Sequence, residues 1–522
     1  MKQLSKYCQY FTLENIVVAA LCITALFAKS KLMTDHAIVP KQLYTGLVLS
    51  LSIVAIAVKL LLGKGFKITP YSWSVIITAI CSAESLYAIF QFCVTRLLGL
   101  DVFICGTFEN PVGLMSALCL ALPFTLYAIA QTCHKKTFIA AAIVIVLAIF
   151  ASQSRTGIIA ALLVLLCFGL RFSKLSLSKR LFIVAGLTVI LIAVSCLINT
   201  DSVTGRLLIW RASLPLISAT PFCGYGIGAF GRLYMEAQAE YLSAFSPDSD
   251  YAMLAGNSIV PFNEYIDFYL NFGILGLLIF IGFVSFLIFA YCRAIESYKS
   301  YALYSLGALA FISLFSYPFT YPFTYVIILI STLFIIKNSF KFSPVKLLKP
   351  AVASIMLLIG VFCSYKVYDR IDAELQWGKA FIKGDLNAYA ILKPRLEHIP
   401  HFLYSYAFEA YKREDYDLSL SLAEQCSNDL SHYDLELLLG DIYLKKENYD
   451  RAEFHYKHAA EMIPCRFTPL LALYDTFTAL GDEHMAKDIA EYILAKPIKV
   501  HSRTVGLIRH KMQKALKVTS NK

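Results

Sequence analysis

Eleven apolar runs follow one another through the first 366 residues, and most of the connections between them are short and polar. The runs lie at about 13–28, 44–62, 69–94, 112–132, 138–151, 158–170, 181–198, 264–290, 301–315, 325–336 and 351–366. Hydrophobic residues make up 58% of the chain and charged residues 16%, so the bilayer is the natural solvent for much of it. The pattern predicts an all-α fold, a polytopic membrane helix bundle of about eleven spans, with a range of about ten to twelve.

Lys and Arg are distributed unevenly between alternate connections. If the N-terminus is cytoplasmic, the connections on its side carry these residues about four times as densely as the others. The denser connections are 1–12, 63–68, 133–137, 171–180, 291–300 and 337–350. The positive-inside rule therefore predicts that the long connection at 199–263 and the C-terminal region lie outside the cytoplasm, a placement that requires an odd number of spans.

The C-terminal region, 367–522, is more polar and has nearly balanced charges, so the net charge of +11 arises from the preceding residues. Small and aromatic residues there follow the order of a tetratricopeptide repeat, with a period of about 33 to 34 residues. They are Leu439, Gly440, Tyr443, Tyr449, Ala452, Tyr456, Ala459 and Pro464. We expect two domains: a membrane domain at 1–366, and a soluble α-solenoid of helix pairs at 367–522.

An α-solenoid of this kind binds partner proteins through its concave face, and a spacer or a dimer contact is the alternative role. Basic residues concentrate after Arg503, where a solvated capping helix competes with a helix that contacts anionic lipid headgroups or a polyanionic glycan. Seven of the 14 cysteines lie in apolar runs, and the 14 show no metal or redox spacing. We therefore expect neither a metal nor another cofactor, and no nucleic-acid partner.

Four motifs occur in a fixed order along the membrane region. They are Phe108-Glu109-Asn110-Pro111, the segment 152–157 (Ser-Gln-Ser-Arg-Thr-Gly), the segment 205–226 with its Gly-Arg start and its Pro221 and Gly224-Tyr225-Gly226 end, and Asn263-Glu264-Tyr265 before 273–276. Together they resemble the O-antigen ligase and polymerase superfamily, which includes the bacterial O-oligosaccharyltransferases.

The resemblance implies a metal-independent glycosyltransferase of the bacterial inner membrane, with its N-terminus in the cytoplasm and its C-terminal domain in the periplasm. Its donor would be a glycan linked to undecaprenyl diphosphate. Three periplasmic acceptors fit: the lipid A core of lipopolysaccharide (a ligase), the end of another glycan (a polymerase), or a protein hydroxyl (an O-oligosaccharyltransferase). Two other classes stay open, namely a flippase or permease for the lipid-linked glycan and a non-catalytic membrane scaffold.

Arg155 and Arg206 match the arginines of the family, and we assign them to the diphosphate. A guanidinium stays charged beside lipid and pairs with two phosphate oxygens at once, which neutralises the charge that develops on the leaving group. Arg211, a turn and a residue beyond Arg206, is an accessory candidate. The competing interpretations are an interfacial anchor for Arg155 and a salt bridge to Asp201 for Arg206.

The resemblance fails at one position. The family generally has His-Asn-Glu before the next span, whereas this chain has Phe262-Asn263-Glu264, so a histidine base is missing there. We expect Asn263 to contact substrate and Glu264 to be either the base for the acceptor or a helix cap.

Glu84 lies in the middle of the third apolar run and shares a helix face with Gln91. A carboxylate at that depth marks either a substrate site or a polar lock between helices, because an unpaired charge is costly in a bilayer.

Overall fold

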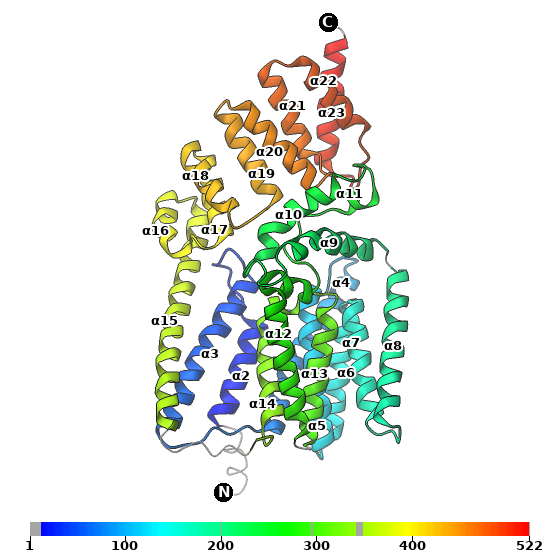
Figure 1. The fold of residues 1–522 in the computed structure, drawn as a ribbon, viewed down its shortest axis with the longest axis vertical. Coiled ribbons are helices and arrows are strands. Elements are labelled where there is room, and N and C mark those ends of the chain that lie inside the picture. The colour runs from blue at the N-terminus through cyan, green and yellow to red at the C-terminus, as the bar shows by residue number, and fades with distance from the viewer. Residues whose placement is uncertain (1–11, 199, 294–295, 341–347, 521–522) are drawn as a thin grey trace. The chain divides into compact units, whose positions relative to one another are not determined.

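The computed structural model describes residues 12–198, 200–293, 296–340 and 348–520 (Figure 1). Helices account for 78% of the structure, and the described residues contain no strand. The predicted all-α class is confirmed. The helices group into two compact units, the first formed by 1–197, 262–264 and 279–379 and the second by 198–261, 265–278 and 380–522.

Each of the eleven predicted apolar runs is helical, and the helix of the run at 264–290 is broken at Gly273. The helices are α2 (Leu13–Phe27), α3 (Ile38–Leu61), α4 (Pro70–Leu97), α5 (Pro111–Gln131), α6 (Lys135–Ala151), α7 (Arg155–Leu170), α8 (Leu177–Ile198), α12 (Glu264–Cys292), α13 (Ser297–Ser313), α14 (Pro322–Ile336) and α15 (Leu348–Lys383). By length and composition, α3, α4, α5, α8, α12 and α15 can cross a membrane, and α2, α7 and α14 are shorter apolar helices. The chain is a polytopic helical membrane protein.

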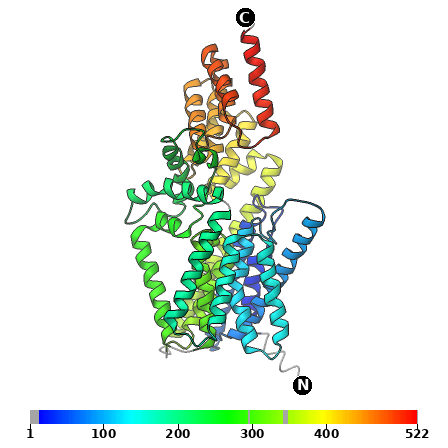
Figure 2. The ribbon, with the colours of Figure 1, turned by 90° about the vertical axis from the view of Figure 1, so that its right-hand side faces the viewer.

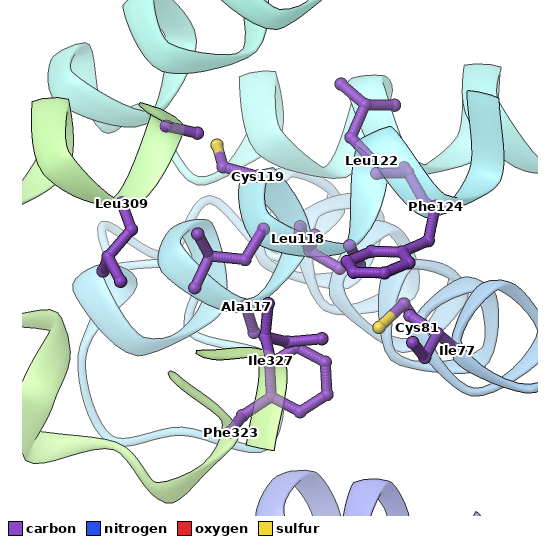
Figure 3. Close-up of a cluster of buried hydrophobic side chains, with 14 of the residues drawn as sticks. Ile77, Cys81, Ala117, Leu118, Cys119, Leu122, Phe124, Leu309, Phe323 and Ile327 are labelled. Carbon is purple, nitrogen blue, oxygen red and sulfur yellow. The ribbon is translucent and has the colours of Figure 1, made fainter. Parts of the chain in front are cut away.

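Helix α5 forms the centre of the first unit, packed by α4, α6, α7 and α13. Figure 3 shows its side chains Leu118, Cys119, Leu122 and Phe124 among residues of α4, α13 and α14. The α5–α7 contact is close, because a Cβ added at Gly157 would lie 2.8 Å from the Cβ of Met115. Buried apolar area of this kind holds α5 in place, and a few hydrogen bonds supplement it, among them that from the Ser305 hydroxyl to the Leu120 carbonyl at 2.8 Å.

Alternate connections of the first unit gather at opposite ends. At one end, Lys41 Nζ donates hydrogen bonds to the Ala28 carbonyl at 3.1 Å and to the Thr107 carbonyl at 2.9 Å, which joins connections 28–37 and 98–110. At the other end, Lys337 Nζ donates to the Ile68 carbonyl at 2.9 Å. Successive helices of the unit therefore run in alternating directions, as in a chain that crosses a bilayer repeatedly.

The second unit combines the long connection with the C-terminal region. The connection supplies α9 (Thr200–Ala219), α10 (Ala229–Leu242) and α11 (Asp250–Leu254). The C-terminal region supplies α16 (Leu386–Leu396), α17 (Pro400–Lys412), α18 (Tyr416–Ser427), α19 (Tyr433–Lys445), α20 (Tyr449–Met462), α21 (Thr468–Leu480), α22 (Glu483–Ala495) and α23 (Arg503–Ser520). The predicted boundary at 366 and 367 stays a prediction, because the compact units follow contacts rather than sequence order.

Helices α17 to α22 pack as consecutive pairs, α17 with α18, α19 with α20 and α21 with α22, and both views show the pairs stacked in chain order (Figures 1 and 2). The same turn recurs before α16, α18, α20 and α22. In each, a residue with positive φ precedes an Asp or Asn whose side chain caps the next helix. The pairs of residues are Gly384 and Asp385, Glu414 and Asp415, Glu447 and Asn448, and Gly481 and Asp482.

The pair formed by α19 and α20 packs most closely at Gly440. A Cβ there would lie 2.5 Å from the ring of Tyr456, which is fully buried together with Ala452 and Ala459. Small residues on one helix thus accept an aromatic ring of the next. The classification of these pairs as tetratricopeptide repeats stays a prediction.

Candidate active site

The predicted site residues are divided between the two units. Glu84, Arg155, Asn263 and Glu264 belong to the first unit, whereas Arg206 and Arg211 belong to the second. The contacts of these residues are therefore those within their own unit.

Arg155 is the first residue of α7. Gln153 precedes it with φ of 55°, and Ser154 caps the helix by accepting a hydrogen bond from the backbone N–H of Gly157 at 3.3 Å. The half-buried guanidinium donates to the Ser195 carbonyl, in the last turn of α8, at 2.6 Å. Among the described residues this is the one hydrogen bond of Arg155, and a guanidinium has five N–H donors in a planar fork. Most of its donors remain for an anionic ligand.

Glu264 begins α12. Its Oε1 accepts a hydrogen bond from the backbone N–H of Phe319 at 2.8 Å, in the 3₁₀ turn η1 (Pro318–Thr320). The carboxylate therefore anchors the connection between α13 and α14, and its role as a base stays a prediction. The half-buried Asn263 directly precedes it.

Phe262 occupies the position where the resemblance leads one to expect histidine. Its φ is 53°, and its ring packs edge-on against Tyr317 with the centroids 5.3 Å apart. A bulky residue in the left-handed region costs about 1–3 kcal/mol, so the surroundings fix this conformation. A phenyl ring cannot accept a proton, and this position therefore supplies no base.

Glu84 is fully buried in α4. Its Oε1 accepts hydrogen bonds from the Thr107 backbone N–H at 2.7 Å and from the Thr107 hydroxyl at 3.1 Å. About two turns further along α4, Gln91 Oε1 accepts a hydrogen bond from the backbone N–H of Gly106 at 2.9 Å. Both side chains thus hold the 98–110 connection onto α4, and a polar lock between helices stays a prediction. Oε2 of Glu84 is buried without a hydrogen-bond partner among the described residues, and a substrate role for Glu84 stays a prediction.

Lys41 was not among the candidates, although a lysine at the edge of an apolar run is a usable signal. It is fully buried and, through Thr107, belongs to the same network as Glu84.

Arg206 and Arg211 lie on α9. Arg206 is half-buried, two residues before the buried Leu208. The exposed Arg211 donates from Nη1 to the hydroxyl of Tyr251 at 2.5 Å and lies over that ring. Arg211 therefore also ties α9 to α11. Trp210 donates from its indole nitrogen to the Pro261 carbonyl at 3.0 Å, which fixes the end of the connection.

The Pro221 to Gly226 segment docks onto a break in α12. Gly273 interrupts that helix with φ of 60° and ψ of −161°. Backbone N–H groups cross the contact in both directions, from Tyr225 to the Leu270 carbonyl at 2.7 Å and from Ile274 to the Pro221 carbonyl at 2.9 Å. This backbone contact accounts for the glycines of both segments without a bound phosphate.

The two glycines at this contact permit the backbones to meet. A Cβ on Gly224 would lie 2.5 Å from the Leu270 carbonyl oxygen, and one on Gly273 would lie 2.4 Å from the Phe222 carbonyl oxygen. Asn271 completes the junction, because its Oδ1 accepts from the backbone N–H of Ala229 at 3.1 Å, where α10 begins.

The fold and these clusters define a polytopic membrane protein whose longest connection is structured and carries cationic residues. Residues 140–281 match the family model described as O-antigen ligase, and this match supports the O-antigen ligase superfamily. The match includes Arg155, Arg206, Arg211, Asn263 and Glu264 but not Glu84. No curated protein matches the sequence.

Proposed function

We propose that the protein is a metal-independent glycosyltransferase of the bacterial inner membrane that transfers a glycan from undecaprenyl diphosphate to a periplasmic acceptor. The observation that carries the proposal is the O-antigen ligase match over 140–281, which contains both predicted diphosphate arginines. Arg155 supports it further, because most of its donors are available to a ligand at a helix start.

The chemistry asks little beyond charge neutralisation and alignment. A sugar 1-diphosphate already carries a good leaving group, so the bond from the anomeric carbon to the phosphate oxygen breaks as the acceptor oxygen forms its bond to that carbon. Arg155 and Arg206 neutralise the negative charge that develops on the departing diphosphate. The acceptor proton passes to water or to Glu264.

The orientation follows from charge. The end of the bundle that holds the 62–69 and 337–340 connections faces the cytoplasm, since the Lys-rich and Arg-rich connections lie there. The opposite end, where α7 and α12 begin, then faces the periplasm together with the connection carrying α9 to α11. Donor and acceptor meet at that face.

The lipid A core, the end of another glycan and a protein hydroxyl all fit as acceptors. Deleting the gene and examining the glycans separates them. Loss of polysaccharide from the core indicates a ligase, loss of the length ladder a polymerase, and loss of glycoprotein an O-oligosaccharyltransferase.

The direct test is transfer from a purified undecaprenyl diphosphate-linked donor. We expect Arg155→Ala and Arg206→Ala each to lower turnover by about 100-fold or more, the usual effect of removing one donor to a developing oxyanion. The matched control is Arg96→Ala, which removes the same charge from an exposed arginine in the last turn of α4. Wild-type turnover in both site variants would refute the proposed charge neutralisation.

Two further outcomes identify the competing classes. Purified protein that moves the lipid-linked glycan across liposomes without forming a glycosidic bond is a flippase. A protein in which Arg206→Ala is fully functional and removal of 367–522 abolishes function is a scaffold.

A further inference from the structure

The C-terminal helices already contact another segment of the same chain. Helix α10 of the long connection packs against α20 within the second unit. Ser431, in the turn before α19, also contacts α10. After α20, the Cys465 thiol lies 3.9 Å from the Ala255 carbonyl oxygen, farther along the connection.

Gln238 forms the buried centre of this contact. Its side chain is 1% exposed, and its Nε2 donates to the Met462 carbonyl at 2.7 Å and to the Gly256 carbonyl at 3.1 Å. Its Oε1 accepts a hydrogen bond from the hydroxyl of the buried Tyr234 at 2.6 Å. The bond to Met462 is the one of the three that reaches α20, since Tyr234 lies on α10 itself and Gly256 in the same connection. It is lost if α10 leaves α20, and a buried group left without a partner costs about 1–3 kcal/mol.

Glu236 and His458 form an ion pair at the rim of the contact. His458 Nε2 lies 2.8 Å from Oε2 of Glu236, and the Ser431 hydroxyl donates to Oε1 of Glu236 at 3.0 Å. The backbone N–H of Ser431 also donates to the Gly231 carbonyl at 3.2 Å. Farther along the connection, Asn257 Nδ2 lies 2.7 Å from Nε2 of His432. The C-terminal helices therefore contact the connection through polar groups at several points.

The contact continues from α10 to the helix that carries Arg206. Leu208 of α9 is buried in a cluster with Leu242 of α10 and Ala255, and Tyr251 packs against the same cluster. Arg206 lies two residues before Leu208 on the same helix. Helix α10 therefore forms part of the surface on which α9 packs, and the position of α10 bears on that of α9.

We propose that the C-terminal helices are the docking platform for the 199–261 connection, and that Gln238 and Glu236 are positioning residues that act through α10 to hold the Arg206 helix in place. This role rests on the proposed transferase function, because its effect is on the helix assigned to the diphosphate. The surface along α20 serves the connection of its own chain rather than a separate protein.

The experiment uses the full chain in nanodiscs and compares two substitutions on α10. Glu236→Gln removes the charge that pairs with His458, and Glu240→Gln makes the same change one turn away, at an exposed carboxylate in no ion pair with the described residues. Gln238→Met tests the buried centre with a side chain of similar length. Amide hydrogen exchange of α10 reports docking, and transfer from the undecaprenyl diphosphate-linked donor reports turnover.

We expect faster exchange in α10, severalfold in Glu236→Gln and about 10- to 100-fold in Gln238→Met, since each lost buried hydrogen bond costs about 1–3 kcal/mol. Turnover should fall in both variants and stay unchanged in Glu240→Gln. The exchanged pair Glu236→His with His458→Glu should restore both readouts, which a purely structural loss of packing would not allow.

The two readouts separate the two proposals. Unchanged exchange of α10 in Glu236→Gln and Gln238→Met overturns the docking platform. Faster exchange with wild-type turnover overturns the positioning role. If the wild type transfers no glycan, the proposed function fails, and the exchange rates alone still decide whether the C-terminal helices hold the connection.

Discussion

The junction between the long connection and α12 predicts a strong effect from one added methyl group. Gly273→Ala places a Cβ 2.4 Å from the Phe222 carbonyl oxygen and 2.7 Å from the backbone nitrogen of Cys223. Both neighbours are backbone atoms, so neither can rotate away. The substitution therefore acts on the contact between Pro221 to Gly226 and the broken helix.

Two costs add at this position. A φ of 60° with ψ of −161° lies in a region that essentially only glycine occupies, and holding alanine there costs about 1–3 kcal/mol. Steric overlap with Phe222 adds about 1–3 kcal/mol. The free energy of opening this junction should fall by about 3 kcal/mol, because the contact can relax by partial separation.

Hydrogen exchange followed by mass spectrometry measures this loss. The backbone N–H groups of Tyr225, Gly226, Ile274 and Leu275 all donate across the junction. A loss of about 3 kcal/mol corresponds to exchange about 100-fold faster at these amides. The control is Gly282→Ala in the same helix, where the added Cβ meets no atom within 4 Å and the expected effect is neutral to about 1 kcal/mol stabilising.

Unchanged exchange at Tyr225 and Ile274 in Gly273→Ala would refute the reasoning, since it would mean that the close approach of the two backbones does not exist. Equal acceleration by Gly282→Ala would refute it differently, because the effect would then belong to helix α12 as a whole.

Two further predictions concern charge. The hydrogen bond from His458 to Glu236 raises the pKa of His458 to about 9 against the opposing effect of burial, and Glu436 on α19 and Glu461 on α20 also raise it. Burial raises the pKa of Glu236, but the hydrogen bond from His458 outweighs burial, so the pKa of Glu236 is lowered. The stabilisation of docking by protonated His458 is therefore complete below about pH 6.5 and lost as the pH rises to about 9. The stabilisation by ionised Glu236 is lost as the pH falls below about 4.5. Amide exchange of α10, corrected for intrinsic rates, should therefore rise between pH 6.5 and 9 in the wild type and not in His458→Gln. Glu84→Ala should destabilise the first unit by about 1–3 kcal/mol, because the Thr107 N–H loses its acceptor. Thermal unfolding in detergent measures this loss, and Glu84→Gln should retain most of the stability. Loss of transfer without loss of stability would assign Glu84 to substrate instead.

The bundle could be predicted from sequence because each apolar run is continuous and bounded by polar residues. The starts of α7 and α5 could also be predicted, since Ser154 before Arg155 and Asn110 before Pro111 are standard cap residues. Periodicity did not show which helix would be central. Helix α5 is almost wholly buried and α8 has no buried residue, yet both are uniformly apolar.

The contacts of the long connection could not be predicted in the same way. The break in α12 is hidden within a continuous apolar run, so nothing local pairs Gly273 with Gly224. Glu236 and Gln238 read as solvated residues of a polar helix, because their partners on α20 lie far along the chain. The repeated turn before α16, α18, α20 and α22 was a usable signal that a search for small and aromatic positions missed.

The bond between Gln238 and Met462 spans 224 residues of sequence, which has a consequence for biogenesis. A nascent chain emerges N-terminus first, so α10 is made well before the helix that receives it exists. Until then, its buried face has no cover and is open to proteases and to aggregation. Folding of the second unit is thus a late event, and stop codons that remove α20 should leave a protein that is made but short-lived.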